Sequence, residues 1–369
     1  MDQKRVRTMM GLMVALMLWS CTPSSDDAPE IRTADLPPLE SNHVLTISDA
    51  DSGSEELFFQ QVSTVLSDSK GRIYIPDMDR SVLEIHIYDR EGNYVNSFGG
   101  VGSGPGEFQS LLNLSFGADD RLFAFDVMQA RNTIFREADE NEWTVDNIFQ
   151  IEGSRYSIAA TGEEGALVLR QSIQQPPGDG AFWFEHEMAT GQIEEGLREP
   201  NVLQIRDRGY LSDGIMTEMP FGRRTLVASD QNGSIYIVWS DRLEIAVYDV
   251  NLELTDSITV NLPNLPVSSE ERDEAIDRAP ANLHTLVRQH MPENKPVLRE
   301  LWVDPVGNFW VHTYDSPEYL VIDGSGTPLA SFDLPDDVRF QYVDEERIYA
   351  VRMGDEGYEV LVYAYQLNS

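Results

Sequence analysis

The chain has 369 residues and a formal net charge of −36, because 63 Asp and Glu residues outweigh 27 Lys and Arg residues. Such an acidic chain lacks the basic surface that nucleic-acid binding requires, and anionic lipid head groups would repel it. Cys21 is the only cysteine, which excludes an intramolecular disulfide and a cysteine-based zinc site.

The first residues have the composition of a secretory signal peptide. Lys4, Arg5 and Arg7 form a basic start, and an apolar run of ten residues follows from Met9 to Leu18. A bilayer-spanning helix needs about 20 apolar residues, so this run is too short to cross a membrane. We therefore predict that residues 1–20 are a signal peptide that is removed.

The sequence Leu18-Trp19-Ser20-Cys21 resembles the lipobox of bacterial lipoproteins, in which the cysteine is acylated and becomes the new N-terminus. The resemblance implies that Cys21 is the lipidation site and that a lipid anchor ties the protein to a membrane of the bacterial cell envelope. Thr22 follows the cysteine in place of Asp, which by enterobacterial sorting rules implies the outer membrane. An ordinary signal peptide with an incidental cysteine is the alternative.

Residues 21–42 are rich in Pro, Ser, Asp and Glu after the cysteine. A segment of this composition buries too little apolar surface to fold, so we predict a flexible acidic tether. The folded domain is then expected over residues 43–369.

A repeated pattern runs through the remaining chain. Residues 62–99, 224–260 and 297–334 each contain a short apolar strand, an Asp or Gly turn, an alternating strand, and a further pair of strands around a second turn. Weaker copies occupy residues 111–151 and 156–197. Antiparallel four-stranded units that recur in this way are typical of propeller blades.

A sixth copy begins at Val338 and ends after its third strand. An orphan strand, residues 43–48, precedes the first copy, and open sheet edges are a liability. We therefore predict an all-β fold, a six-bladed β-propeller in which residues 43–48 complete the last blade.

The glycine-rich sequence FGGVGSGPGEF at residues 98–108 is similar to the NHL-repeat signature, and Asp77 and Asp126 match the Asp that follows the second strand in that repeat. Residues 43–369 resemble the six-bladed, NHL-repeat-like and TolB-like propeller lipoproteins of Bacteroidota-like bacteria. The resemblance implies the fold and leaves the chemistry open, because propellers carry many unrelated functions.

The longest departures from the repeat are expected at one mouth of the propeller. In a blade, the connection between the second and third strands and the connection to the next blade emerge on the same face; these connections are residues 99–107, 171–180, 198–222 and 263–296. The 263–296 insertion has a helical pattern that starts with a capping box of Ser268 and Glu271 and is split by Pro280. It could be a lid over the mouth or an element packed on a neighbouring blade.

Basic and aromatic residues gather near this face in an otherwise acidic chain: Arg206, Arg208, Tyr210, Arg223 and Arg224. Arg and Tyr are favoured at recognition surfaces, so we predict that these residues contact an anionic ligand. The alternative is that the arginines pair with the surplus of Asp and Glu.

No established catalytic or nucleotide-binding motif is present, and the histidines do not occupy equivalent blade positions, so no metal site and no cofactor are predicted. Calcium remains an option because carboxylates are abundant, although residues 49–53 only partly match a calcium loop. Trp143, Trp183, Trp239, Trp302 and Trp310 are expected in the core between blades.

These features favour a lipid-anchored, extracytoplasmic, non-enzymatic module that binds or scaffolds an envelope protein, a peptide or a glycan. The alternative is a metal-dependent hydrolase or lyase, as in the lactonase and amidating-lyase propellers. Nucleic acid is not an expected partner.

Overall fold

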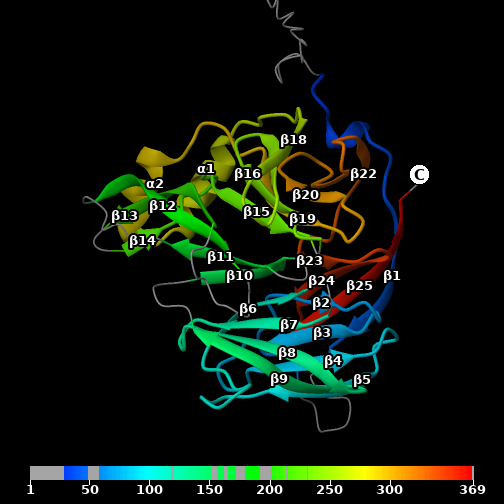
Figure 1. The fold of residues 1–369 in the computed structure, drawn as a ribbon. Helices are drawn as coiled ribbons and strands as arrows, with labels where there is room; N and C mark the ends of the chain where they lie inside the picture. The colour runs from blue at the N-terminus through cyan, green and yellow to red at the C-terminus, as the bar shows by residue number, and fades with distance from the viewer. Residues whose placement is uncertain are drawn as a thin grey trace, which may run out of the picture.

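The structure is a computed structural model that describes residues 29–48, 58–117, 120–150, 156–161, 165–171, 179–191, 201–212, 215–230 and 232–367. In these residues antiparallel strands form six separate sheets, which follow one another around the molecule (Figure 1). Each sheet has four strands except the third blade, which has five. The protein is therefore an all-β, six-bladed propeller, as the repeat predicts.

The strands of each blade are paired in chain order in the first five blades. Blades one and two contain β2 (Leu66–Ser67), β3 (Ile73–Asp77), β4 (Glu84–Tyr88), β5 (Tyr94–Gly99), β6 (Leu111–Phe116), β7 (Leu122–Asp126), β8 (Arg131–Asp139) and β9 (Glu142–Gln150). Blade three contains β10 (Tyr156–Thr161), β11 (Gly165–Gln171), β12 (Gly180–Gly191), β13 (Asn201–Ser212) and β14 (Ile215–Thr217). Blades four and five contain β15 (Thr225–Ser229), β16 (Ile235–Trp239), β17 (Leu243–Tyr248), β18 (Leu254–Val260), β19 (Leu298–Val303), β20 (Phe309–Thr313), β21 (Tyr319–Ile322) and β22 (Pro328–Phe332).

The sixth blade joins the two ends of the described chain. It contains β23 (Val338–Val343), β24 (Arg347–Met353) and β25 (Tyr358–Gln366), and its outer strand is β1 (Glu40–Ile47). β1 runs antiparallel to β25, with Glu40 opposite Gln366 and Ile47 opposite Val360. The predicted closure by an N-terminal strand is confirmed, and it satisfies the backbone groups that β25 would otherwise expose.

A buried Asp in the turn between the first and second strands explains the sequence repeat. Asp304 accepts hydrogen bonds from the backbone N–H of Val306 (3.1 Å) and Asn308 (2.8 Å) and from Nε1–H of Trp310 (3.0 Å). The same arrangement links an Asp to a second-strand Tyr hydroxyl in blades one, four and six: Asp68 and Tyr74, Asp230 and Tyr236, Asp344 and Tyr349. The Asp thus fixes the turn and supplies the partner that a buried Tyr or Trp requires.

A second kind of Asp connects neighbouring blades. Asp126 follows the second strand of blade two and accepts hydrogen bonds from the backbone N–H of Gln109 (2.6 Å), Met128 (2.9 Å) and Gln129 (3.0 Å). Asp77 does the same in blade one, where it bonds the backbone of Gln60 and other residues. Both carboxylates are buried, so their role in these positions is to hold the connection that arrives from the preceding blade.

The core consists of apolar clusters between neighbouring blades. Trp310, Tyr74 and Tyr349 are among the largest fully buried side chains, and each comes from a second strand. Trp143 and Trp302 pack against two of these clusters. Trp183 does not fit the expectation that the tryptophans lie in the core, because 45% of its surface is exposed.

Residues 29–42 do not behave as the tether that their composition predicts. Arg32 pairs with Asp315 of blade five (Nη2 to Oδ1, 2.7 Å), and the buried Thr33 lies in a short 3-10 helix, Thr33–Asp35. The N–H of Leu39 donates to the carbonyl of Ser331 (2.8 Å). This stretch therefore lies along the outer edges of the blades before it enters β1 (Figure 1). Backbone hydrogen bonds hold it there, although it buries little apolar surface. The residues before 29 lie outside the described part.

The predicted helical insertion contains α1 (Ser269–Arg278), a 3-10 turn (Ala281–Leu283) and α2 (His284–His290). The capping box of Ser268 and Glu271 is present, and the first helix ends before Pro280, as expected. None of the helices in the described residues is long and apolar enough to cross a membrane.

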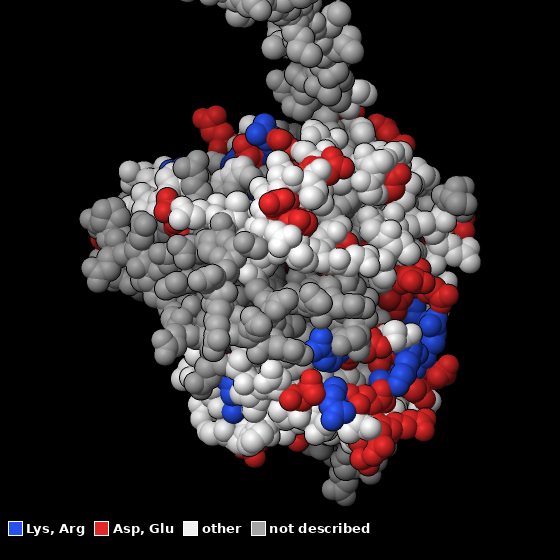
Figure 2. All heavy atoms as spheres, viewed as in Figure 1, with Lys and Arg blue, Asp and Glu red and all other residues white. Residues whose placement is uncertain are grey.

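Charges of both signs lie together on parts of the surface. Figure 2 shows Lys and Arg side chains among Asp and Glu over blade one and the neighbouring strands β1 and β25, whereas acidic side chains are more scattered elsewhere on the visible face. Arg72 is one pairing residue, with its Nη1 2.6 Å from Glu137 of blade two and its Nε 2.7 Å from Asp68.

Candidate functional site

A cavity of about 1460 Å³ opens on the face where each blade connects to the next. We call this the mouth face, and the opposite face, which carries the turns between first and second strands, the turn face. The cavity is lined by the connections from blade three to four, four to five, five to six and six to one. Residues 218–224 and the 263–296 insertion, through Arg278 and Pro296, thus reach the same mouth, as the topology predicts. Residues 99–107 do not line the cavity, and residues 172–178 lie outside the described part.

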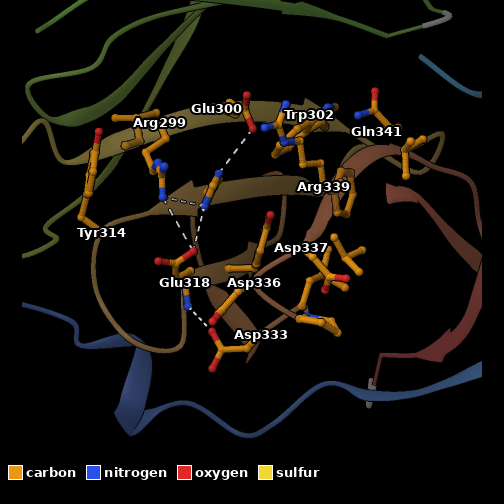
Figure 3. Close-up of a pocket in the computed structure, with 18 of the residues that line it drawn as sticks. Arg299, Glu300, Trp302, Tyr314, Glu318, Asp333, Asp336, Asp337, Arg339 and Gln341 are labelled. Atoms are coloured by element: carbon orange, nitrogen blue, oxygen red, sulfur yellow. Dashed lines mark hydrogen bonds and ion pairs between the residues drawn. The ribbon is translucent and has the colours of Figure 1, made fainter. Parts of the chain in front are cut away.

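His312 lies at the centre of a polar network in the wall of the cavity. Its ring stacks on Tyr319, with centroids 4.5 Å apart and an interplanar angle of 8°. Its Nδ1 is 3.3 Å from Oε2 of Glu300, and its Nε2 is 3.2 Å from Oε2 of Glu318. Glu300 lies in β19 and Glu318 in the loop between β20 and β21, and Figure 3 shows both carboxylates in the wall of the cavity. The stacking and the two contacts fix the orientation of the imidazole.

Arg299 extends this network toward the opening. Its guanidinium lies over the Tyr314 ring at 4.7 Å, and its Nη1 is 3.7 Å from Oε2 of Glu318. Burial acts to raise the pKa of Glu300, but hydrogen bonding to His312, together with attraction to His312 and nearby arginines, leaves that pKa below its ordinary value. Glu300 is therefore an anion at neutral pH, held by a fixed set of partners.

Exposed carboxylates occupy the connection from blade five to six. Asp333, Asp336 and Asp337 line the cavity and are exposed, and Asp333 accepts a hydrogen bond from the backbone N–H of Glu318 (2.6 Å). Figure 3 shows that Asp336 and Asp337 lie between Glu318 and Arg339 around the opening. In contrast to the network around His312, these side chains face water and keep their charges available to a ligand.

An aromatic wall completes the cavity. Trp302 packs on Phe340 with ring centroids 4.4 Å apart, and Phe340 in turn contacts Tyr319 at 5.9 Å. All three line the cavity. The site therefore combines apolar surface with convergent charges, which is the usual composition of a ligand-binding site.

The five residues predicted to bind a ligand do not form one surface. Arg224 lines the cavity, where its Nη2 donates to the carbonyl of Arg299 (2.6 Å). Arg223 instead pairs with Asp241 (Nε to Oδ1, 2.7 Å) and donates to the carbonyl of Asn294 (2.9 Å), in line with the alternative that the arginines neutralise acidic residues.

The other three lie in a strand, although residues 198–222 were expected to form a loop. Arg206, Arg208 and Tyr210 belong to β13, which pairs with β12 over most of its length, from Ala181 opposite Tyr210 to Thr190 opposite Asn201. Tyr210 is only 5% exposed, and Arg208 lies over the Trp183 ring at 5.5 Å. The side chain of Arg206 lies outside what the structure describes. A role for these residues in binding stays a prediction.

The helical insertion packs on blade three, one of the two arrangements that the sequence left open. Ile276, Leu286 and Val287 form a buried cluster with Tyr210 and Met219. The insertion therefore buries the outer part of blade three, and it reaches the cavity through Arg278 at the end of α1 and through Pro296.

Among the described residues, no group of three or more His, Cys, Asp or Glu side chains is arranged to hold a metal ion. The partial calcium motif at residues 49–53 and Cys21 both lie outside the described residues.

Sequence reasoning missed Glu300, His312, Glu318 and the three Asp residues of the blade five-to-six connection. The sequence contains one indication of the site. Arg299 and Glu300 are adjacent charged residues in β19, a first strand whose buried residues, such as Leu298 and Leu301, are apolar. The pairing across strands could not be read from spacing alone.

Comparison with known proteins supports the fold. A family model described as a six-bladed beta-propeller, DUF5128, matches residues 53–135. No curated protein shows significant sequence similarity to the chain.

Solved structures share the architecture at low identity. A provisionally assigned exported protein of Bacteroides fragilis is 10% identical with a TM-score of 0.56, over 92% of this chain and 98% of that one. A DUF4221 family member from Bacteroides vulgatus is 11% identical with a TM-score of 0.55, over 90% of this chain and 99% of that one. A gluconolactonase from Xanthomonas campestris is 12% identical with a TM-score of 0.41, over 92% and 98% of the two chains. At these identities the likeness to the two Bacteroides structures extends to the fold and not to the activity.

Proposed function

We propose that the protein is a lipid-anchored, extracytoplasmic binding module that holds a basic peptide segment of an envelope protein in the mouth cavity. The observation that carries the proposal is the cavity itself, which brings exposed carboxylates and an aromatic wall together at one opening. The signal-peptide pattern and Cys21 support the anchor and the extracytoplasmic location.

The size of the cavity favours an extended ligand. Pockets for small molecules usually enclose about 300–1,000 Å³. The cavity here, at about 1460 Å³, exceeds that range and has room for several residues of a peptide. Because four connections line it, such a segment would contact blades four, five and six together.

The charge of the lining favours a basic ligand. Carboxylates outnumber guanidinium groups among the lining residues: Glu218, Glu300, Asp315, Glu318, Asp333, Asp336 and Asp337 against Arg224, Arg278, Arg299 and Arg339. A neutral glycan could donate hydroxyl hydrogen bonds to these carboxylates, but it would leave their surplus negative charge uncompensated. Lys or Arg side chains would supply charge-assisted hydrogen bonds.

The test is a peptide selection followed by affinity measurements. A random heptapeptide library is selected on the purified protein lacking residues 1–21, and the enriched peptides are measured by fluorescence anisotropy. We expect enrichment of Lys and Arg, and an affinity that falls about tenfold or more in the triple variant D333N/D336N/D337N, because several charged contacts are lost.

A matched control removes the same number of charges elsewhere. D139N/E140Q/E142Q changes exposed carboxylates around the turn between β8 and β9, far along the chain from the cavity. This variant should bind the selected peptides like the wild type. Equal losses in both triple variants would show that only net charge matters, and enrichment without basic residues would refute the proposal.

The anchor has its own test. Cys21→Ser should move the protein from the membrane fraction to the soluble fraction of the cells, because the lipid is attached through that sulfur. Retention in the membrane fraction would rule out the lipid anchor and would leave the peptide-binding proposal unaffected.

A further inference from the structure

A second cavity, separate from the mouth, lies between blades three and four. It encloses about 510 Å³. Its lining residues come from β12, β13, β15 and β16: Trp183, Glu185, Gln204, Ile205, Thr225, Ile237 and Trp239. None of these residues lines the mouth cavity. Its volume falls in the range of about 300–1,000 Å³ that is usual for small ligands.

Two tryptophans form an open aromatic wedge in this cleft. The rings of Trp183 and Trp239 have centroids 5.7 Å apart and an interplanar angle of 42°. Trp183 is 45% exposed, whereas Trp310, in the second strand of blade five, is 1% exposed. Leaving a large indole surface in water is unfavourable, so its position in a cleft points to a ligand that covers it.

Among the side chains that the structure describes here, one positive and one negative charge flank the wedge. Arg208 is the cross-strand neighbour of Trp183, and its guanidinium lies 5.5 Å from the centre of that ring. Glu185 is exposed and lines the cleft. A cationic ligand would be repelled by Arg208, which already lies over one face of Trp183, and an anionic ligand would be repelled by Glu185.

Hydrogen-bonding groups lie at the edge of the wedge. Glu185 and Gln204 are exposed and line the cleft together with Thr225. Together they offer carboxylate and amide oxygens as acceptors and amide and hydroxyl groups as donors. A suitable ligand is therefore neutral, has an apolar face for the indoles, and carries hydroxyl groups around its edge.

We infer that this cleft is a binding site for a neutral saccharide, with a pyranose ring stacked on Trp183 and Trp239 and its hydroxyl groups bonded to Glu185 and Gln204. A pyranose presents C–H groups on its faces and hydroxyl groups on its rim, which matches the wedge and its edge. The site is independent of the peptide site proposed at the mouth, so either can fail without the other.

The test uses three neutral glucose hexasaccharides with different linkages: cellohexaose, laminarihexaose and maltohexaose. Binding to the protein lacking residues 1–21 is followed by tryptophan fluorescence and by isothermal titration calorimetry. We expect at least one to bind, and Trp183→Ala to weaken that binding about tenfold or more, as for other aromatic anchors. Trp183→Phe should retain part of the affinity because it keeps an aromatic face.

Two controls distinguish a loss of binding at this cleft from unfolding of the protein and from an effect at the mouth cavity. Trp183→Ala should keep a cooperative thermal transition, with a lower melting temperature because the half-buried indole packs on Trp239 and Arg208. The mouth variant D333N/D336N/D337N should bind the saccharide normally while losing the peptide.

Several results would overturn the inference. One is no binding of any of the three hexasaccharides at about 10 mM, which would correspond to less than about 3 kcal/mol of binding free energy. Another is saccharide binding that Trp183→Ala leaves unchanged. A third is preferential binding of tetramethylammonium, which would make the cleft a cation cage.

Discussion

Asp304 on the turn face and Asp336 and Asp337 on the mouth face use the same residue type in opposite ways. On the turn face, Asp304 is 1% exposed and its oxygens accept bonds from its own turn and from Trp310. On the mouth face, Asp336 and Asp337 are exposed and line a cavity. Carboxylates whose oxygens are fully hydrogen-bonded within the protein contribute to stability, whereas carboxylates that face an open cavity remain available to a ligand. The location of an Asp in the blade therefore says more about its role than the acidic composition does.

The largest effect should come from removing the strand that closes the ring. Deleting residues 40–47 removes the partner of β25 and exposes an edge between the last and first blades. We expect loss of the cooperative thermal transition measured by circular dichroism. Deleting residues 22–28 leaves every described contact in place and should keep the wild-type transition. Similar transitions in the two truncations would mean that closure is unimportant.

Asp304→Ala should be the most damaging single change among the carboxylates compared above. It leaves the buried Nε1–H of Trp310 and two turn N–H groups without their acceptor, which costs about 2–4 kcal/mol of unfolding free energy. Asp336→Ala at the mouth should change it by no more than about 0.5 kcal/mol. Urea unfolding of both variants measures the difference, and equal losses would break the contrast between the faces.

The ion pair between blades one and two predicts an acid-sensitive part of the stability. The hydrogen bond from Arg72 lowers the pKa of Glu137 from 4.5 to about 2. Because the folded pKa is the lower one, the stabilisation is present above about pH 4.5 and is lost as the pH falls toward 2.

Unfolding in urea as a function of pH measures this contribution. Glu137→Gln should lower stability at pH 7 and reduce the slope between pH 4.5 and pH 2, the interval spanned by the two pKa values. Glu140→Gln, which changes an exposed neighbour, should leave the slope as it is. An unchanged slope in Glu137→Gln would show that the pair makes no difference to acid stability.

The smallest effect should come from the mouth carboxylates themselves. D333N/D336N/D337N removes like charges from one connection of a chain with a net charge of −36, so its melting temperature should stay level or rise slightly at low salt. Added salt should raise the wild-type melting temperature more than that of the variant, because the variant has less charge repulsion for the salt to screen. A clear loss of stability would show that these residues serve the fold.

Local sequence patterns predict the repeated blades, the closure of the ring and the capped first helix of the insertion. Alternating strands, the turn Asp six residues before Tyr74, Tyr236 or Trp310, and the capping box of Ser268 are local patterns whose consequences are local. The number of repeats and the orphan strand then left one economical way to close the ring.

The side chains that meet in space could not be paired from the sequence and follow from the three-dimensional fold. Arg206, Arg208 and Tyr210 were expected on a loop, but the pairing of β13 with β12 made them part of a strand, and the helical insertion buried Tyr210. His312 in β20 contacts Glu300 of the neighbouring strand β19 and Glu318 of the loop that follows β20, which the pairing of the strands brings together. The composition of residues 29–42 predicts a segment that does not fold. These residues nevertheless pack on the blades through backbone hydrogen bonds and the ion pair of Arg32 with Asp315, and residue types alone do not predict such contacts. Contacts between distant segments depend on register and on which blade receives an insertion, and neither is encoded in local spacing.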